Sequence, residues 1–184
     1  MERPFFILAT QNPIEQAGTF PLPEAQLDRF LLYIKIDYPT AEEEASILMN
    51  TTGSKKNKIE SVINGDEIIR AQAMVREVHI SSELVQFVSE VVRATRPNHT
   101  NVKFVKDWVR WGAGPRAGQA MILAAKARAL LNGRFAVVLE DLHEIANAVL
   151  GHRILMNFRA EADGIAPSQV TEHLIKEIKP TAKI

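Results

Sequence analysis

Apolar residues recur at helical spacing over most of the chain after residue 40. The stripe is clearest in residues 82–95, where one face carries Leu84, Phe87, Val88, Val91 and Val92. Further helices are expected at residues 41–52, 67–77, 104–111, 115–132, 140–150 and 168–179. Residues 115–132 are apolar on nearly every side and rich in alanine, which is typical of a closely packed central helix. The pattern predicts a mainly α fold built around a helical bundle.

Local signals support the ends of these helices. Thr40 and Glu43 have the spacing of a capping box, in which each side chain satisfies a free backbone amide of the other. Ser81 or Ser82 is suited to cap the helix that follows. Trp108 and Trp111, three residues apart, are expected in the core, with an exposed interaction anchor as the alternative.

The first 38 residues have a different pattern. Residues 5–8 form an apolar run that is too short for a helix and indicates a strand buried on both faces. Residues 31–38 alternate between apolar and polar side chains, which indicates a half-exposed strand. A short helix is expected between them, from Pro23 to about Arg29. This part of the chain is typical of an α/β domain.

Polar side chains gather where the first predicted strand ends. Asn12 follows the strand, and Pro13 prevents the strand from continuing. In open α/β sheets, ligands bind beyond the carboxyl ends of strands, so Asn12 lies where a ligand-sensing group is expected. The alternative is that Asn12 and Pro13 form only a turn.

Three motifs occur in an order that resembles the MoxR family of AAA+ ATPases: ATQNP and GTFPLPEAQLDRF within residues 9–30, and GAGPRA at residues 112–117. The resemblance implies a sensor 1 role for Asn12 and an arginine-finger role for Arg29, both as catalytic residues. It implies a sensor 2 role for Arg116. It further implies ATP and Mg²⁺ as cofactors, a ring of identical subunits, commonly a hexamer, and chaperone-like remodelling of partners such as von Willebrand A domain proteins.

The residues around Arg116 also indicate a phosphate site on physical grounds. Gly114 suits the cap of a helix and Pro115 its first position, which puts Arg116 in the first turn. A cation there opposes the helix dipole at a cost of about 0.3–1 kcal/mol, and a bound anion would remove that cost. Free amides at the start of the helix that Pro115 opens, together with the Arg116 guanidinium, suit a nucleotide phosphate. The alternative is an ion pair with a carboxylate of a neighbouring helix.

Two further sites are open to a simpler interpretation. Arg29 follows a carboxylate and precedes a predicted strand. A local ion pair with Asp28, or an interstrand ion pair, worth less than about 1 kcal/mol if exposed, is therefore the alternative to an arginine finger that acts on a neighbouring subunit. His152 and Arg153 resemble the LRHRI element of the family, with Gly151 in place of an arginine. We interpret this element as packing.

The composition of the chain disfavours several classes of ligand and partner. The 184 residues contain 22 basic and 22 acidic side chains, so no global field favours nucleic acid or an anionic membrane. There is no cysteine, the five histidines lack metal-ligand spacing, and no apolar run is long enough to cross a membrane. We therefore expect a cytoplasmic protein, no metal site in this chain and no nucleic-acid partner.

No P-loop motif and no Walker B segment occur in the sequence. We therefore expect residues 1–38 to be the C-terminal part of an AAA+ core, 39–66 a first lid helix with a basic linker, and 67–184 a helical lid. ATP and Mg²⁺ would be held mainly by residues outside this chain, which alone should not hydrolyse ATP. Residues 1–38 should be weakly ordered or paired with another molecule, because the strand between their two strands is missing.

A second function class remains open from sequence alone. The helices also fit a non-enzymatic adaptor that docks a partner protein. Partner binding that is insensitive to nucleotide and to Arg29→Ala would favour the adaptor.

Overall fold

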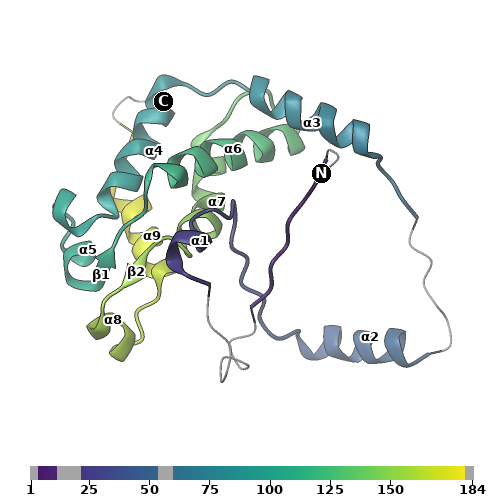
Figure 1. Ribbon diagram of the computed structural model, residues 1–184, viewed down its shortest axis with the longest axis horizontal. Helices are drawn as coiled ribbons and strands as arrows, with labels where there is room; N and C mark the ends of the chain where they lie inside the picture. Colours follow the sequence, from purple (N-terminus) through teal and green to yellow (C-terminus); the bar gives the residue numbers. More distant parts are fainter. Residues whose placement is uncertain (1–3, 12–21, 54–59, 181–184) are drawn as a thin grey trace.

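The computed structural model describes residues 4–11, 22–53 and 60–180, and it confirms the mainly α fold (Figure 1). The elements are α1 Glu24–Leu27, α2 Ala41–Thr52, α3 Gly65–Glu77, α4 Ser82–Ala94, the 3₁₀ helix η2 Pro97–His99, α5 Lys103–Trp108, β1 Val109–Trp111, α6 Pro115–Leu131, α7 Leu139–Leu150, β2 Leu155–Met156, α8 Phe158–Ala162 and α9 Pro167–Glu177.

The core lies where α4 and α7 pack against α6, and α9 packs against α7 and α4. α6 buries small side chains, Ala117, Ala120, Ala124, Ala125 and Ala129, which let its neighbours approach closely. Larger side chains from the surrounding helices fill the space, including Phe87, Leu142, Leu150 and Leu174, each almost fully buried. Burial of one such side chain contributes about 1.5–3 kcal/mol, so this bundle provides the main stabilisation. The prediction of a central α6 is confirmed.

Capping interactions fix the starts of three helices. The Thr40 hydroxyl accepts the amide of Glu43 at 3.3 Å and the Glu43 carboxylate accepts the amide of Thr40 at 2.8 Å, as the sequence predicts for α2. Ser81 caps α4 by accepting the amide of Leu84 at 3.3 Å. Asn64 and Glu67 form the same reciprocal pair at the start of α3.

The segment around Trp111 departs from the predicted helix. The helix ends at Trp108, and Val109–Trp111 pairs antiparallel with Leu155–Met156. Pairing with a strand that is distant in sequence overrides local propensity here, as is common for short segments. Trp111 is 70% exposed, so its predicted place in the core is wrong.

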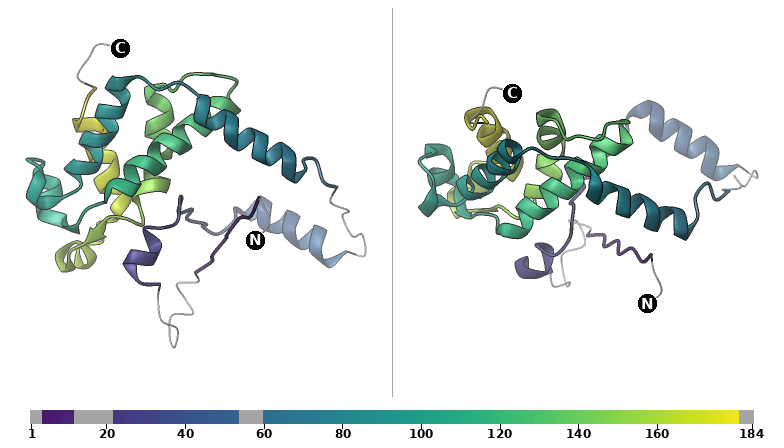
Figure 2. Two further views of the ribbon diagram at one scale, coloured as in Figure 1. Left: turned by 45° about the horizontal axis from the view of Figure 1, so that its top comes forward. Right: turned by 90° about the horizontal axis from the view of Figure 1, so that it is seen from above.

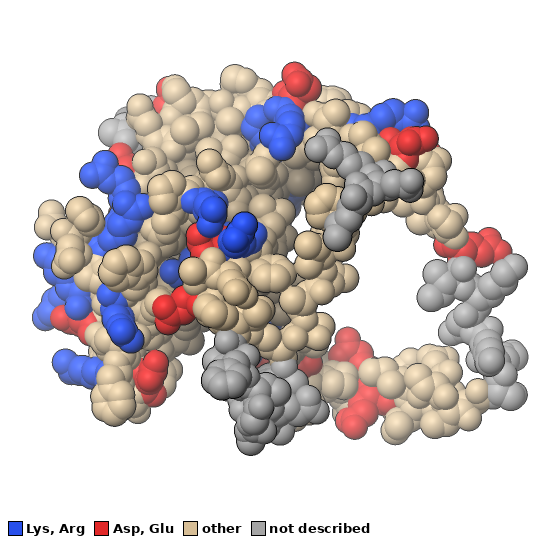
Figure 3. Space-filling model, in the orientation of Figure 1, with Lys and Arg blue, Asp and Glu red and all other residues tan. Residues whose placement is uncertain are grey.

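Lysine and arginine side chains gather near α5 and β1, at the left of Figure 3.

The structure also departs from prediction at the two N-terminal strands. Neither residues 5–8 nor residues 31–38 join a sheet within the described parts of the chain, and Phe6 is 84% exposed. A strand needs a neighbouring strand for its ladder of backbone hydrogen bonds, and within the described residues no strand pairs with either segment. α2 extends away from the helical body, and residues 4–11 form an extended trace (Figure 2).

Candidate functional site

The loop before α6 is fixed to the end of α4. The Thr95 hydroxyl accepts the amide of Ala113 at 2.9 Å, and Nε of Arg96 donates to the carbonyl of Ala113 at 3.0 Å. A Cβ at Gly112 would lie 2.5 Å from the carbonyl carbon of Thr95 and 2.7 Å from the nitrogen of Arg96. Only glycine fits this close approach, which explains the first residue of the GAGPRA motif.

This loop sets the position of Arg116. Gly114 is the N-cap of α6 and Pro115 lies in its first turn, as predicted. Nη1 of Arg116 lies 3.5 Å from Oδ2 of Asp28, and the Arg116 side chain is 59% exposed. The structure therefore shows the ion pair with a carboxylate that the sequence left open as an alternative. The carboxylate belongs to Asp28 at the end of α1, and not to a helix of the bundle. An ion pair this exposed contributes less than about 1 kcal/mol, so Arg116 remains available to a stronger anionic partner.

Arg29 lies beside this ion pair without joining it. Its side chain is exposed, and no ion pair of Arg29 occurs within the described residues. The Asp28 carboxylate instead contacts Arg153 and Arg116. The sequence alternative of an Asp28–Arg29 pair is therefore wrong.

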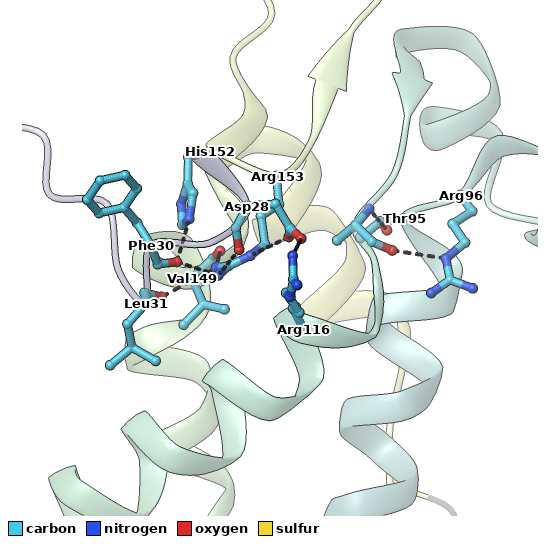
Figure 4. Close-up of polar contacts among 10 residues, drawn as sticks. Asp28, Phe30, Leu31, Thr95, Arg96, Arg116, Val149, His152 and Arg153 are labelled. Atoms are coloured by element: carbon cyan, nitrogen blue, oxygen red, sulfur yellow. Dashed lines mark hydrogen bonds and ion pairs between the residues drawn. The ribbon is translucent and has the colours of Figure 1, made fainter. Parts of the chain in front are cut away.

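The sequence did not predict the polar contacts that Arg153 makes. Its Nε donates to Oδ1 of Asp28 at 3.1 Å, and Nη2 donates to the carbonyls of Asp28, at 3.1 Å, and of Phe30 (Figure 4). Nη1 donates to the carbonyls of Leu31, at 3.3 Å, and of Val149 in the last turn of α7. One guanidinium thus joins the residues around Arg29 to the helical bundle, so the packing expected for this element includes polar contacts that the sequence did not predict.

The environment of Arg153 explains why it has so many partners. Only 2% of its side chain is exposed, and burial lowers the pKa of the Arg153 guanidinium while the Asp28 carboxylate opposes that shift. A buried cation is costly unless its donors are matched by acceptors, and here five acceptor atoms surround it. A basic residue directly after a helix end, where carbonyls lack partners, is the signal that could have identified it.

His152 adds a second contact to the same segment. Its Nε2 lies 3.2 Å from the carbonyl of Phe30, which can only accept, so Nε2 carries the proton. Burial lowers the pKa of His152, and the neighbouring Arg153 charge lowers it further. Its ring packs 6.0 Å from the ring of Tyr33, whose amide donates to the carbonyl of Ala148 at 2.8 Å. His152 is therefore a neutral packing residue that also binds the chain next to Arg29.

The remaining predicted site residue is Asn12, which lies outside the described residues. The structure thus brings together Arg116, Pro115 and the segment that carries Arg29, and it leaves the position of Asn12 untested. Within residues 4–11, 22–53 and 60–180, no group of three or more histidine or carboxylate residues is arranged to hold a metal ion.

Comparison with known proteins gives two family matches. Residues 1–32 match the ATPase family associated with various cellular activities, and residues 103–177 match the AAA lid domain. The chain is similar to Chaperone MoxR1 of Mycobacterium tuberculosis, with 38% identity over 97% of the chain and 47% of the relative. It is also similar to protein YeaC of Bacillus subtilis, with 34% identity over 96% of the chain and 53% of the relative.

A solved structure has the same fold. The crystal structure of a protein described as an ATPase from Cytophaga hutchinsonii superposes with a TM-score of 0.92 and is 35% identical. The match covers 99% of this chain and 56% of that protein. The chain spans about half the length of the relatives it matches.

Proposed function

This chain belongs to the MoxR family of AAA+ ATPases, and we propose that it is the sensor and lid portion of an ATP-driven, chaperone-like remodeller of partner proteins. The observation that carries the proposal is the proximity of the two motif arginines. Arg29 lies next to Asp28, and Asp28 contacts Arg116. Residues of two distant motifs therefore meet in one place, which supports a role of both motifs in nucleotide recognition.

In this proposal, Arg116 and Pro115 contribute to the binding of a nucleotide phosphate. The fit rests on the exposed Arg116 guanidinium in the first turn of a long helix, whose positive end favours an anion. A phosphate carries more charge than a carboxylate and accepts paired guanidinium donors, so it would compete with Asp28 for Arg116.

Arg29 is proposed as the arginine finger and Asn12 as the sensor 1 residue. The exposed Arg29 side chain is available to a second molecule, and an arginine supplied by a neighbouring subunit stabilises the charge on the transferring phosphoryl group. Such an arginine contributes about 10³ to 10⁵ in rate. Asn12 would orient the attacking water. ATP supplies the phosphoryl group, and Mg²⁺ would be held by residues outside this chain.

The proposed assembly is a ring of identical subunits, with a hexamer as the specific form. Residues 1–38 would complete the AAA+ core, residues 39–66 would join it to the lid, and residues 67–184 would form the lid. Partner proteins with a von Willebrand A domain are the proposed clients, and the cytoplasm is the proposed location. Among the described helices, none has the length and apolar character needed to cross a bilayer.

The test joins this chain to the part of Chaperone MoxR1 that precedes its match, and measures ATP turnover by the chimera. We expect Arg29→Ala to lower kcat at least about a hundredfold, and Arg116→Ala to weaken ATP binding. Arg70→Ala is the matched control, because Arg70 is an exposed arginine of α3 away from the site. Turnover that is unchanged by both site variants would contradict the proposal.

The chain by itself gives a second test. We propose that the purified 184 residues neither bind ATP tightly nor turn it over. Turnover by this chain that disappears with Arg116→Ala would overturn that part of the proposal.

A further inference from the structure

We propose that Arg153 is the positioning residue of Arg29, a role that rests on the proposed function of Arg29 as the arginine finger. The evidence is the set of atoms that Arg153 binds. Its guanidinium donates to the carbonyls of Asp28, Phe30 and Leu31, which are the residues on both sides of Arg29, and to the Asp28 carboxylate. Arg153 therefore fixes the main chain that carries the finger without touching the Arg29 side chain.

Arg153 is itself fixed to a rigid element. It follows the last turn of α7 closely, and Nη1 donates to the carbonyl of Val149 in that turn. Its side chain is almost fully buried, and α7 packs against both α6 and α9. The position of the segment around Arg29 is therefore set by the core of the bundle.

Local structure around Arg29 is too weak to do the same. α1 has four residues, and none of them is buried. Two other contacts attach this segment to the bundle, the Tyr33 amide on the carbonyl of Ala148 and His152 on the carbonyl of Phe30. Both lie on the C-terminal side of Arg29. Within the described contacts, Arg153 and Arg116 hold the N-terminal side through Asp28, and of these two arginines only Arg153 is buried.

The consequence for function is geometric. A finger arginine must reach a phosphoryl group on a neighbouring subunit, and a misplacement of about 1 Å can lower a rate about a hundredfold. The planar fork of arginine matches several carbonyls at once, whereas lysine offers one ammonium. Arg153→Lys should therefore keep the buried cation and its attraction to Asp28, but lose the simultaneous hold on both sides of Arg29.

The direct test measures amide hydrogen exchange in the full chain. In Arg153→Met, we expect the Tyr33 amide to exchange at least about tenfold faster, while amides in the middle of α6 exchange at the unchanged rate. Arg153→Lys, the second variant, keeps the buried charge in case Arg153→Met does not fold, and should show an intermediate increase. An unchanged Tyr33 exchange rate in a folded variant would overturn the proposal.

The functional test is a double-mutant cycle in the ATPase chimera. We expect Arg153→Lys to lower kcat at least about tenfold with the KM for ATP changed less than about twofold, and to have almost no effect when Arg29→Ala is already present. A merely structural role would lower activity to the same extent in both backgrounds, which would overturn the proposal. If Arg29→Ala alone leaves kcat unchanged, the proposed finger fails, and the exchange experiment still decides whether Arg153 holds this segment.

Discussion

The Asp28 carboxylate accepts the Nε–H of Arg153 at 3.1 Å, so the residue before the exposed Arg29 is held by a buried arginine of the helical body. The other carboxylate oxygen lies 3.5 Å from Arg116. Asp28 therefore contacts the buried Arg153 and the exposed Arg116 at the start of α6, and it directly precedes Arg29 in sequence.

Removal of the Asp28 charge should destabilise the chain. Asp28→Asn would leave the buried Arg153 cation with carbonyl partners alone, and we expect a loss of about 1–2 kcal/mol in the free energy of unfolding, because the Asp28 side chain is itself 31% exposed. Urea denaturation measures the change. Asp37→Asn is the control, since its pair with Lys35 is 77% exposed on the aspartate side and should contribute less than about 0.5 kcal/mol. Equal losses in both variants would contradict this reading of Asp28.

Two glycines near α6 should respond to alanine with opposite signs. Gly112→Ala would force a Cβ against the backbone of Thr95 and Arg96, and we expect a loss of about 1–3 kcal/mol. Gly118 lies inside α6, and its added Cβ would meet Val88 at an ordinary 3.7 Å. Gly118→Ala should gain about 0.5–1 kcal/mol, because alanine favours a helix interior. Thermal unfolding of both variants measures the signs, and a stable Gly112→Ala would refute the close packing at this loop.

Acid should weaken the contact between the α6–α7 loop and α7. Arg134 donates to both carboxylate oxygens of Asp141, at 2.7 and 2.6 Å, and this pairing lowers the pKa of Asp141. A lowered pKa stabilises the fold above the unfolded value of about 4, and that contribution is lost as the pH falls through the folded value.

Asp141→Asn should therefore cost about 2 kcal/mol near neutral pH, and the difference from the parent chain should shrink as the pH falls from about 6 to about 3. Urea midpoints at several pH values give both quantities. A difference that stays constant over this range would show that the Asp141 charge does not contribute.

His152 should make stability depend on pH in a higher range. Burial and the Arg153 charge lower the pKa of His152. The unfolded chain therefore takes up this proton first, and stability is lost as the pH falls below the unfolded value of about 6.5. In His152→Gln, which keeps a donor for the carbonyl of Phe30, the loss between about pH 7.5 and pH 5 should be smaller. Identical pH profiles for both proteins would contradict a neutral, buried His152.

The sequence predicted the helices well because their signals are local. The stripe of α4, the alanine-rich α6 and the capping box at Thr40 each follow from neighbouring residues, and the structure confirms all three. The prediction that failed at Trp111 involves pairing with β2, a segment distant in sequence. Local propensity carries no information about such a partner.

The same contrast between local signals and contacts distant in sequence applies to the candidate site. The start of α6 at Gly114 and Pro115 was determined by the sequence alone, because caps and helix starts depend on adjacent residues. The roles of Arg29, Pro115 and Arg116 stay predictions. Only the tertiary structure decided that Asp28 pairs with Arg153 and Arg116 rather than with Arg29. The reason is physical, because a buried guanidinium needs hydrogen-bond acceptors. In the folded chain, the residues on both sides of Arg29 lie next to the end of α7 and supply those acceptors to Arg153.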